Sequence, residues 1–297
     1  LLISAVSVAA AVAASAHAIM FKRDNRAAIG WVGLIWLSPI LGPILYVLLG
    51  INRIRRRGQK IGEAATCPVS EIAWGPTPQE FRRRQPFAST PGLDRLVRVV
   101  DHLTARPLEP GNRVTPLVGG EESYPAMLAA IDAAERSVAL ATYIFDNDRA
   151  GREFLDALRR AAGRGVEVRV LIDDVGSRYS RPRMTRELRR AGLNVQTFLP
   201  TRVPRLFHYA NLRNHRKILV ADGRVGFTGG TNIRGGHRGD WETHHPIQDV
   251  HFRVEGPVVA HLQEVFATDW AFCCDEVLDG EAWFPELKPA GDAWART

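Results

Sequence analysis

One stretch of this 297-residue chain carries more information than any other: Asn214-His215-Arg216-Lys217-Ile218-Leu219-Val220-Ala221-Asp222. Its pattern is H-x-K-x-x-x-x-D, and a glycine turn follows at Gly229-Gly230-Thr231-Asn232. Side chains alternate between the two faces of an extended strand, so His215 and Lys217 are expected to point the same way. The pair would place an imidazole nucleophile or acid beside a fixed cation. This arrangement suits attack on a phosphodiester, whose oxygens the cation neutralises.

Neighbouring residues add donors to this pair. The side chain of Asn232 and the amides of Gly229 and Gly230 are able to donate hydrogen bonds to phosphate oxygens. Lysine is rare against a large excess of arginine, with Lys217 one of only four: Lys22, Lys60, Lys217 and Lys288. A buried lysine here therefore indicates a chemical requirement for a compact ammonium.

The motif resembles that of the phospholipase D superfamily, and much of the chain resembles the cardiolipin synthase branch. Three other segments resemble signature segments of those synthases, in the family's order: Thr142–Asp146, Arg164–Asp173 and Asp249–Pro257. The resemblance implies an α/β sandwich that carries out metal-free chemistry, without a cofactor. It also implies that His215 is the nucleophile or the acid of a phosphohistidine mechanism and that Lys217 is a phosphate ligand.

The resemblance assigns expected roles to four further residues. Asp222 belongs to the family motif, and because Asp-Gly is a good turn pair, fixing local geometry is its favoured role. Gly230 stands where many relatives have Ser, so Asn232 is the stronger candidate to bind phosphate or position the motif. Asp249 matches the acidic residue that bonds the catalytic histidine in the superfamily. Such a carboxylate would orient His215 and stabilise its imidazolium, although a surface aspartate is the alternative.

Metal binding is not expected. A histidine-rich stretch with nearby acids has no standard zinc spacing, and the three cysteines form neither a disulfide framework nor a metal pattern. Asp173-Asp174 imitates a metal dyad, but it follows a predicted strand and is interpreted as a loop. The histidine-rich stretch comprises His237, Asp240, Glu242, His244, His245 and His251.

The N-terminal region predicts a membrane hairpin. Residues 28–50 carry no charge and would span about 35 Å as one helix, kinked at Pro39 and Pro43. Residues 1–20 are uncharged but rich in alanine, so they are either a first membrane helix, which the family favours, or a signal peptide. Residues 53–60 are more basic than the short link between the two segments, which predicts a cytoplasmic catalytic domain.

Charge and hydrophobic pattern complete the domain prediction. The net charge of +7 fits nucleic acid or an anionic membrane surface, but the uncharged segment argues against a soluble nuclease, so no nucleic-acid partner is expected. We predict a transmembrane hairpin at 1–57, a Pro- and Arg-rich connector at 58–107, and a first phospholipase D-like domain at 108–297. In that domain, strands are predicted at 113–118, 138–145, 166–172, 195–199, 217–220 and 224–228, and helices at 124–134, 151–162, 183–191 and 257–270.

The main functional hypothesis is a phosphatidyltransferase of the bacterial inner membrane that makes cardiolipin from two phosphatidylglycerol molecules. Synthases of this type carry two H-x-K-x-x-x-x-D motifs, and this chain has one. A missing C-terminal half or a second chain is therefore expected to complete the site. The alternatives are a hydrolytic phospholipase D or related phosphodiesterase, with water as the acceptor, and a membrane-tethered module that binds anionic lipid without turnover.

Overall fold

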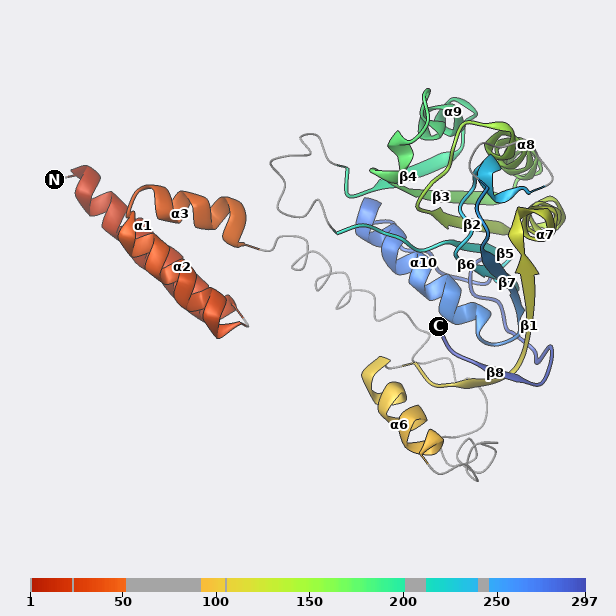
Figure 1. Ribbon diagram of the computed structural model, residues 1–297, viewed down its shortest axis with the longest axis horizontal. Helices are drawn as coiled ribbons and strands as arrows, with labels where there is room; N and C mark the ends of the chain where they lie inside the picture. Colours follow the sequence, from red (N-terminus) through yellow and green to blue (C-terminus); the bar gives the residue numbers. More distant parts are fainter. Residues whose placement is uncertain (1, 23, 52–91, 105, 201–211, 240–245) are drawn as a thin grey trace. The chain divides into compact units, whose positions relative to one another are not determined.

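The computed structural model describes residues 2–22, 24–51, 92–104, 106–200, 212–239 and 246–297. The chain divides into two compact units, Leu1–Lys60 and Ile61–Thr297, which are described separately. Figure 1 labels their helices and strands along the sequence.

The first unit is helical. It contains α1 (Leu2–Phe21), α2 (Asn25–Leu37), α3 (Leu41–Leu45) and a π-helical turn, Tyr46–Gly50. Asp24 caps α2 by accepting a hydrogen bond from the amide of Arg26. A small buried cluster holds the helices together, formed by Ala11, Ala14, Ala18, Ile35 and Tyr46.

The prediction of two membrane-spanning helices is not confirmed, because the segment 28–50 is not one helix. Among the described residues, one helix is long and apolar enough to cross a membrane, and its span is Ser4–Phe21 in α1. α2 ends before Ser38, whose φ of −139° is far from helical, as is common for a residue that precedes proline. The chain then folds back closely, because a Cβ on Gly42 would lie 2.6 Å from the Cα of Ile35.

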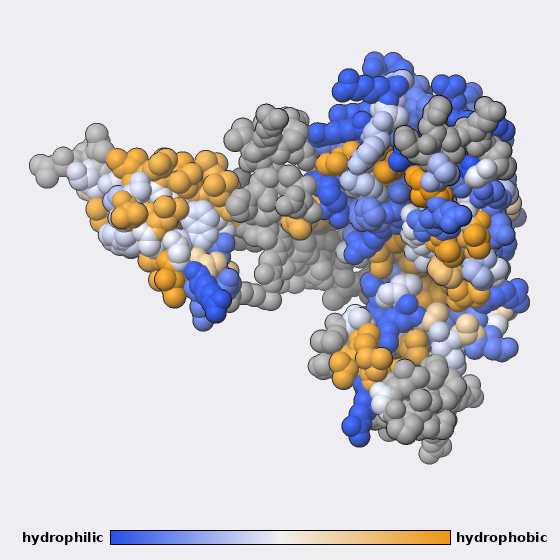
Figure 2. Space-filling view, in the orientation of Figure 1, coloured by the Kyte–Doolittle hydropathy of each residue, from blue (hydrophilic) through white to orange (hydrophobic). Residues whose placement is uncertain are grey.

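The surface of this unit is largely apolar, as Figure 2 shows. Leu37 is 86% exposed, and Met20, Ile29 and Leu48 are similarly uncovered. Contiguous apolar surface of this kind is rare on soluble monomers and marks a protein or membrane contact.

The second unit is built on a mixed eight-stranded sheet with the order β4-β3-β2-β5-β6-β7-β1-β8. β2, β3 and β4 are parallel neighbours, and the remaining pairs are antiparallel. The strands are β1 (Glu109–Val118), β2 (Ser137–Thr142), β3 (Glu167–Asp173), β4 (Asn194–Phe198), β5 (Ile218–Ala221), β6 (Val225–Gly229), β7 (Val250–Glu255) and β8 (Ala293–Ala295).

Helices cover both faces of this sheet, so the α/β sandwich is confirmed. α7 (Gly119–Ala133), α8 (Arg149–Gly163) and α9 (Met184–Arg190) contribute to one apolar cluster, with Leu219 of β5. α10 (Val259–Cys274) contributes to the other cluster, with Ile218 and Val220 of the same strand. Successive residues of β5 therefore face opposite layers, as the alternation rule requires. Figure 1 shows α10 apart from α7 and α8, with the central strands between them.

Each predicted strand and helix of this unit is present, with shifted ends. The run 138–145 leaves the sheet after Thr142, and the helix predicted at 257–270 extends to Cys274. Sequence analysis missed the strands β7 and β8, and it also missed the helix α6 (Leu93–Thr104), which forms inside the predicted connector 58–107. Most of that connector lies outside the described residues.

Candidate active site

The sheet topology brings the predicted site residues to one end of the central strands. Ala141 of β2 pairs with Ile218, Ile218 pairs with Thr228, and Gly229 pairs with His251. The segments just beyond these pairs therefore meet: the residues after β2, those before β5, the turn after β6 and the start of β7. Such convergence at strand ends is where open α/β sheets place their sites.

His215 and Lys217 lie side by side, which confirms the prediction from strand alternation. The Nζ of Lys217 is 2.9 Å from Nδ1 and 3.3 Å from Nε2 of His215, and it donates a hydrogen bond of 2.8 Å to the His215 carbonyl. The imidazole is exposed, whereas Lys217 is only 5% exposed. Tyr143 backs the pair, with its ring 4.6 Å from the imidazole centroid and 5.7 Å from Nζ. The ammonium is therefore held in place while the imidazole remains accessible.

Burial lowers the pKa of both groups, and the charge of Lys217 lowers that of His215 further. Desolvation, followed by the charge of Lys217, lowers the pKa of His215, so the imidazole is neutral at pH 7. Desolvation lowers the pKa of Lys217 to about 8, and the charge of Asp249 opposes that shift. At neutral pH the pair is thus a neutral imidazole beside a charged ammonium, which are the states required of a nucleophile and a phosphate ligand.

Asp249 lies beside Lys217 in the electrostatic network, not against His215. One of its oxygens accepts the amide hydrogen of Val250 at 2.8 Å, and among the described residues it makes no hydrogen bond to the imidazole. Asp249 raises the pKa of Lys217, but the pKa of His215 responds to Lys217 and Asp173 instead. The expected contact between Asp249 and His215 is therefore absent from this structure.

Gly230 provides space rather than a free donor. Its amide donates to the carbonyl of Val250 at 3.2 Å, so the prediction that this amide binds phosphate is wrong for this structure. A Cβ at this position would lie 2.0 Å from a carboxylate oxygen of Asp249. A serine like that of many relatives would have to displace Asp249, which gives a physical reason for glycine here.

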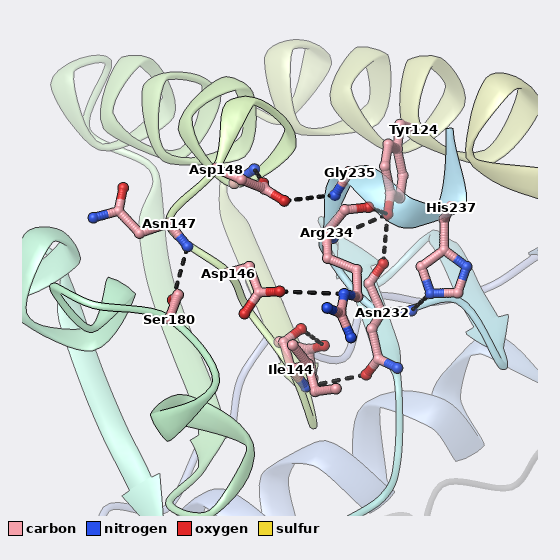
Figure 3. A network of polar contacts seen from close by, with 12 residues as sticks. Tyr124, Ile144, Asp146, Asn147, Asp148, Ser180, Asn232, Arg234, Gly235 and His237 are labelled. Atoms are coloured by element: carbon pink, nitrogen blue, oxygen red, sulfur yellow. Dashed lines mark hydrogen bonds and ion pairs between the residues drawn. The ribbon is translucent and has the colours of Figure 1, made fainter. Parts of the chain in front are cut away.

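Asn232 positions the turn after β6 and keeps one donor free. Its Oδ1 accepts the amide hydrogen of Ile144 at 3.0 Å, and its own amide donates to Nε2 of His237 at 3.3 Å. Figure 3 shows this side chain directed at Ile144, the second residue after β2. Among the described residues, Nδ2 of Asn232 makes no hydrogen bond, so it remains able to bind an oxyanion.

A polar network behind Asn232 holds this turn against the start of α8 (Figure 3). The Tyr124 hydroxyl lies 2.6 Å from the carbonyl oxygen of Asn232 and accepts the amide hydrogen of Arg234. Nε of Arg234 is 3.2 Å from the carboxylate of Asp146, and Asp148 accepts the amide hydrogen of Gly235. Sequence analysis missed this network because its partners are separated by about 90 residues or more along the chain.

Asp222 lies at the opposite end of β5 from Lys217, about 16 Å away along an extended strand. Its carboxylate accepts hydrogen bonds from the amides of Glu135, Arg136 and Ser137, where β2 begins. Its own φ of 53° is in the left-handed region, which Asp tolerates in tight turns. The geometry gives Asp222 a structural role and no contact with His215.

We expect Asp222→Ala to lower the free energy of unfolding by about 2–4 kcal/mol, because it removes a charged acceptor shared by three amides. Chemical denaturation of the second unit within the intact chain measures this loss. Asp279→Ala, at an exposed position, is the matched control. Turnover per folded molecule should be retained, and its loss in a folded variant would give Asp222 a chemical role.

Two buried histidines complete the surroundings and were not predicted as site residues. His251 is 0% exposed, and burial lowers its pKa to about 4. His237 is also buried, with a lowered pKa. Each responds to the charges of both Asp249 and Lys217, so both are neutral neighbours of the site.

Among the described residues, no three His, Cys, Asp or Glu side chains are grouped to hold a metal ion. Asp240, Glu242, His244 and His245 of the histidine-rich stretch lie outside those residues. Asp173 instead accepts the amide hydrogens of Val175 and Asn214, and Asp174 pairs with Arg178. Asp173 is the last residue of β3 and Asp174 is in the turn after it, so the loop prediction holds only for Asp174.

Comparison with known proteins identifies the region that contains this geometry. Residues 127–270 match the family described as "Cardiolipin synthase, PLD-like domain". They are a phospholipase D-like domain of the cardiolipin synthase family. Residues 9–50 match a second family, described as "Phospholipase_D-nuclease N-terminal". The phospholipase D-like domain contains His215, Lys217 and every other candidate site residue.

Similarity to individual cardiolipin synthases extends over most of the chain. Cardiolipin synthase A of Pseudomonas aeruginosa is 34% identical over 261 residues, which are 86% of this chain and 52% of that protein. Cardiolipin synthase of Geobacillus kaustophilus is 32% identical over 268 residues, covering 88% and 52%. The chain therefore spans about half the length of these curated relatives. Among solved structures, Nuc of Salmonella typhimurium, a phospholipase D family member, has 20% identity and a TM-score of 0.43, covering 55% of this chain and 96% of Nuc.

Proposed function

We propose that this chain forms the membrane-bound first half of a phosphatidyltransferase that makes cardiolipin from two phosphatidylglycerol molecules. The observation that carries the proposal is the contact between the neutral, accessible His215 and the buried ammonium of Lys217. A nucleophile and a phosphate ligand at this spacing suit attack on a phosphodiester. The similarity to cardiolipin synthases supports this choice of substrate.

The proposed reaction has two steps with one covalent intermediate. A ring nitrogen of His215 bonds to the phosphorus of one phosphatidylglycerol, the bond from phosphorus to glycerol oxygen breaks, and glycerol leaves with a proton from an acid. The hydroxyl of a second phosphatidylglycerol then bonds to phosphorus and gives its proton to the conjugate base of that acid, while the phosphorus–nitrogen bond breaks and His215 is released. Lys217 neutralises the non-bridging oxygens in both steps, and Nδ2 of Asn232 donates to one of them.

The acid that protonates glycerol is proposed to come from a second H-x-K motif. His215 itself serves as the nucleophile, and the site described above supplies one such histidine. A C-terminal half or a second chain would bring the partner motif, in keeping with relatives of which the matched part is 52%. The exposed face of His215 is where that partner would act.

The N-terminal unit is proposed to anchor the enzyme in a bacterial inner membrane as a multi-pass hairpin, with the catalytic domain in the cytoplasm. The apolar surface of this unit and the spanning length of α1 support membrane contact. A cysteine introduced near Gln59 should be protected from an impermeant thiol reagent in intact cells. Labelling there in intact cells would contradict the orientation.

The function is tested with the complete protein in vesicles that contain labelled phosphatidylglycerol. Cardiolipin together with released glycerol supports the proposal, and trapping of a labelled, acid-sensitive protein adduct supports the intermediate. Phosphatidic acid as the main product would show hydrolysis instead. Binding to the vesicles without any product would indicate a lipid-binding module.

The lowered pKa of Lys217 predicts an alkaline limit for this reaction. Because the ammonium must be charged, activity should fall as pH rises through about 8. Asp249→Asn removes the negative charge that supports the ammonium, so the alkaline limb should move to lower pH. Profiles of kcat against pH measure both effects. Glu255→Gln, at the far end of β7, is the control, and an unmoved limb in Asp249→Asn would contradict this electrostatic role.

A further inference from the structure

Asp269 of α10 bonds to the residues on both sides of His215. Its Oδ2 accepts a hydrogen bond of 2.8 Å from Nδ2 of Asn214, and both of its oxygens lie within 2.7 Å of Nη1 of Arg216. The side chain of Asp269 is 13% exposed, whereas that of Arg216 is 53% exposed. One largely buried carboxylate therefore holds the two residues that flank the proposed nucleophile.

Asp269 does not contact His215. Strand alternation explains how its bonds to Asn214 and Arg216 still orient the imidazole. Ile218 and Val220 face the cluster that contains α10, and Leu219 faces the opposite layer. The same alternation continues upstream: Asn214 and Arg216 face Asp269, while His215 and Lys217 share the other side. Fixing the even-numbered side chains thus fixes the direction of the odd-numbered pair.

Further contacts make the segment rigid. Oδ1 of Asn214 accepts the amide hydrogen of Arg216 at 3.0 Å, and the amide of Asn214 donates to Asp173 at the end of β3. The helix that carries Asp269 is anchored by Phe266 and Trp270, both fully buried against the sheet. His215 precedes β5 and has no sheet pairing of its own, so these contacts supply the constraint that a strand would otherwise give.

We propose that Asp269 is a positioning residue, which sets the orientation of His215 by holding Asn214 and Arg216 from the opposite side of the sheet. The proposal rests on the function proposed above, since it assigns a role in the same site. A misplacement of about 1 Å in a reacting group costs about a hundredfold in rate. Loss of the bonds from Asp269 to Asn214 and Arg216 should therefore lower kcat strongly. The substrate KM should stay nearly unchanged, because Asp269 is not proposed to contact substrate.

The test compares Asp269→Ala with Glu264→Gln in the complete protein. Glu264 lies on the same helix and makes an ion pair of 3.0 Å with Arg106, away from the motif. We expect kcat for cardiolipin formation to fall about a hundredfold in Asp269→Ala and to be retained in Glu264→Gln. Arg216→Ala, at an exposed side chain, removes only one of the two contacts of Asp269, so it should lower kcat less. The double variant should be no slower than Asp269→Ala alone, because the ion pair is already lost there.

A second readout uses no lipid substrate. Carbethoxylation of His215, followed by mass spectrometry across a pH series, reports the pKa of the imidazole in each variant. In Asp269→Ala this pKa should rise towards the ordinary value for histidine, as the ring leaves the desolvated position beside Lys217. Arg216→Ala provides the same readout if Asp269→Ala does not fold, as judged by thermal unfolding.

The outcomes separate the two proposals. If the unsubstituted protein makes no cardiolipin but the pKa of His215 is still shifted in Asp269→Ala, the positioning role is supported and the proposed function is contradicted. An unchanged pKa overturns the positioning role whatever happens to kcat, since a fall in kcat alone would reflect general destabilisation. Equal losses in Asp269→Ala and Glu264→Gln overturn it as well.

Discussion

His215→Ala is expected to abolish phosphatidyl transfer. The imidazole is the accessible member of the pair, and the depressed pKa of His215 keeps it neutral, so that a ring nitrogen has a free lone pair at pH 7. Within the described part of the chain, no other nucleophilic side chain is hydrogen-bonded to the ammonium of Lys217. The variant therefore has no group that can hold the phosphorus covalently.

Loss of activity in His215→Ala must be distinguished from loss of folding. The side chain is exposed, so its removal should leave thermal unfolding nearly unchanged. Leu212→Ala, at another exposed position three residues upstream, is the matched control and should retain activity. Trapping with labelled phosphatidylglycerol should give no adduct in His215→Ala. Full cardiolipin formation by this variant would mean that the H-x-K motif is structural.

Much of the domain could be predicted from sequence because its signals are local. Short apolar runs mark the predicted strands, and the spacing of His215 and Lys217 is enough to place them on one side of the chain. The bonds from Asp269 to Asn214 and Arg216 could not be predicted in the same way. It depends on where α10 packs, more than 50 residues away in the sequence.

The prediction of a second membrane-spanning helix is not confirmed, and two local signals compete in that segment. The segment 28–50 is long and uncharged, but Pro39 disfavours a helical conformation at Ser38, and α2 ends there. The alanine-rich segment 1–20 has weaker apolar side chains and no proline, so it forms α1, the one continuous helix of spanning length among the described residues. A continuous helical backbone, more than hydrophobicity, therefore determines which of the two segments forms a helix of spanning length.

The site predictions differ in the kind of information that each one needed. The contact of His215 with Lys217 required only strand geometry, and it is present. The role of Gly230 required knowledge of the sheet register, in which its amide is already bonded to Val250. The expected contact between Asp249 and His215 required the side-chain positions of two distant segments. Those are set by packing, which makes Asp249 a partner of Lys217 instead.

Lys217→Arg is expected to lower kcat by about two to three powers of ten, the typical effect of removing one preorganised group that stabilises a developing charge. The substitution keeps the positive charge, so the loss would come from shape. Nζ fits between the His215 carbonyl, its ring nitrogens and the face of Tyr143 in a position that is 5% exposed. A planar guanidinium is larger and directs its donors in a fixed fork, so it would displace either the imidazole or the phosphate.

The measurement is cardiolipin formation at matched expression, together with the pH profile. Lys288→Arg, the same substitution at an exposed lysine, is the control and should be fully active. Because the guanidinium does not lose its charge in the accessible range, the residual activity of Lys217→Arg should lack the alkaline limb near pH 8. A low kcat that does not fall further near pH 8 would show that the alkaline decrease in activity comes from deprotonation of Lys217. Full activity with the limb intact would exclude Lys217 as the phosphate ligand and assign the titration to another group.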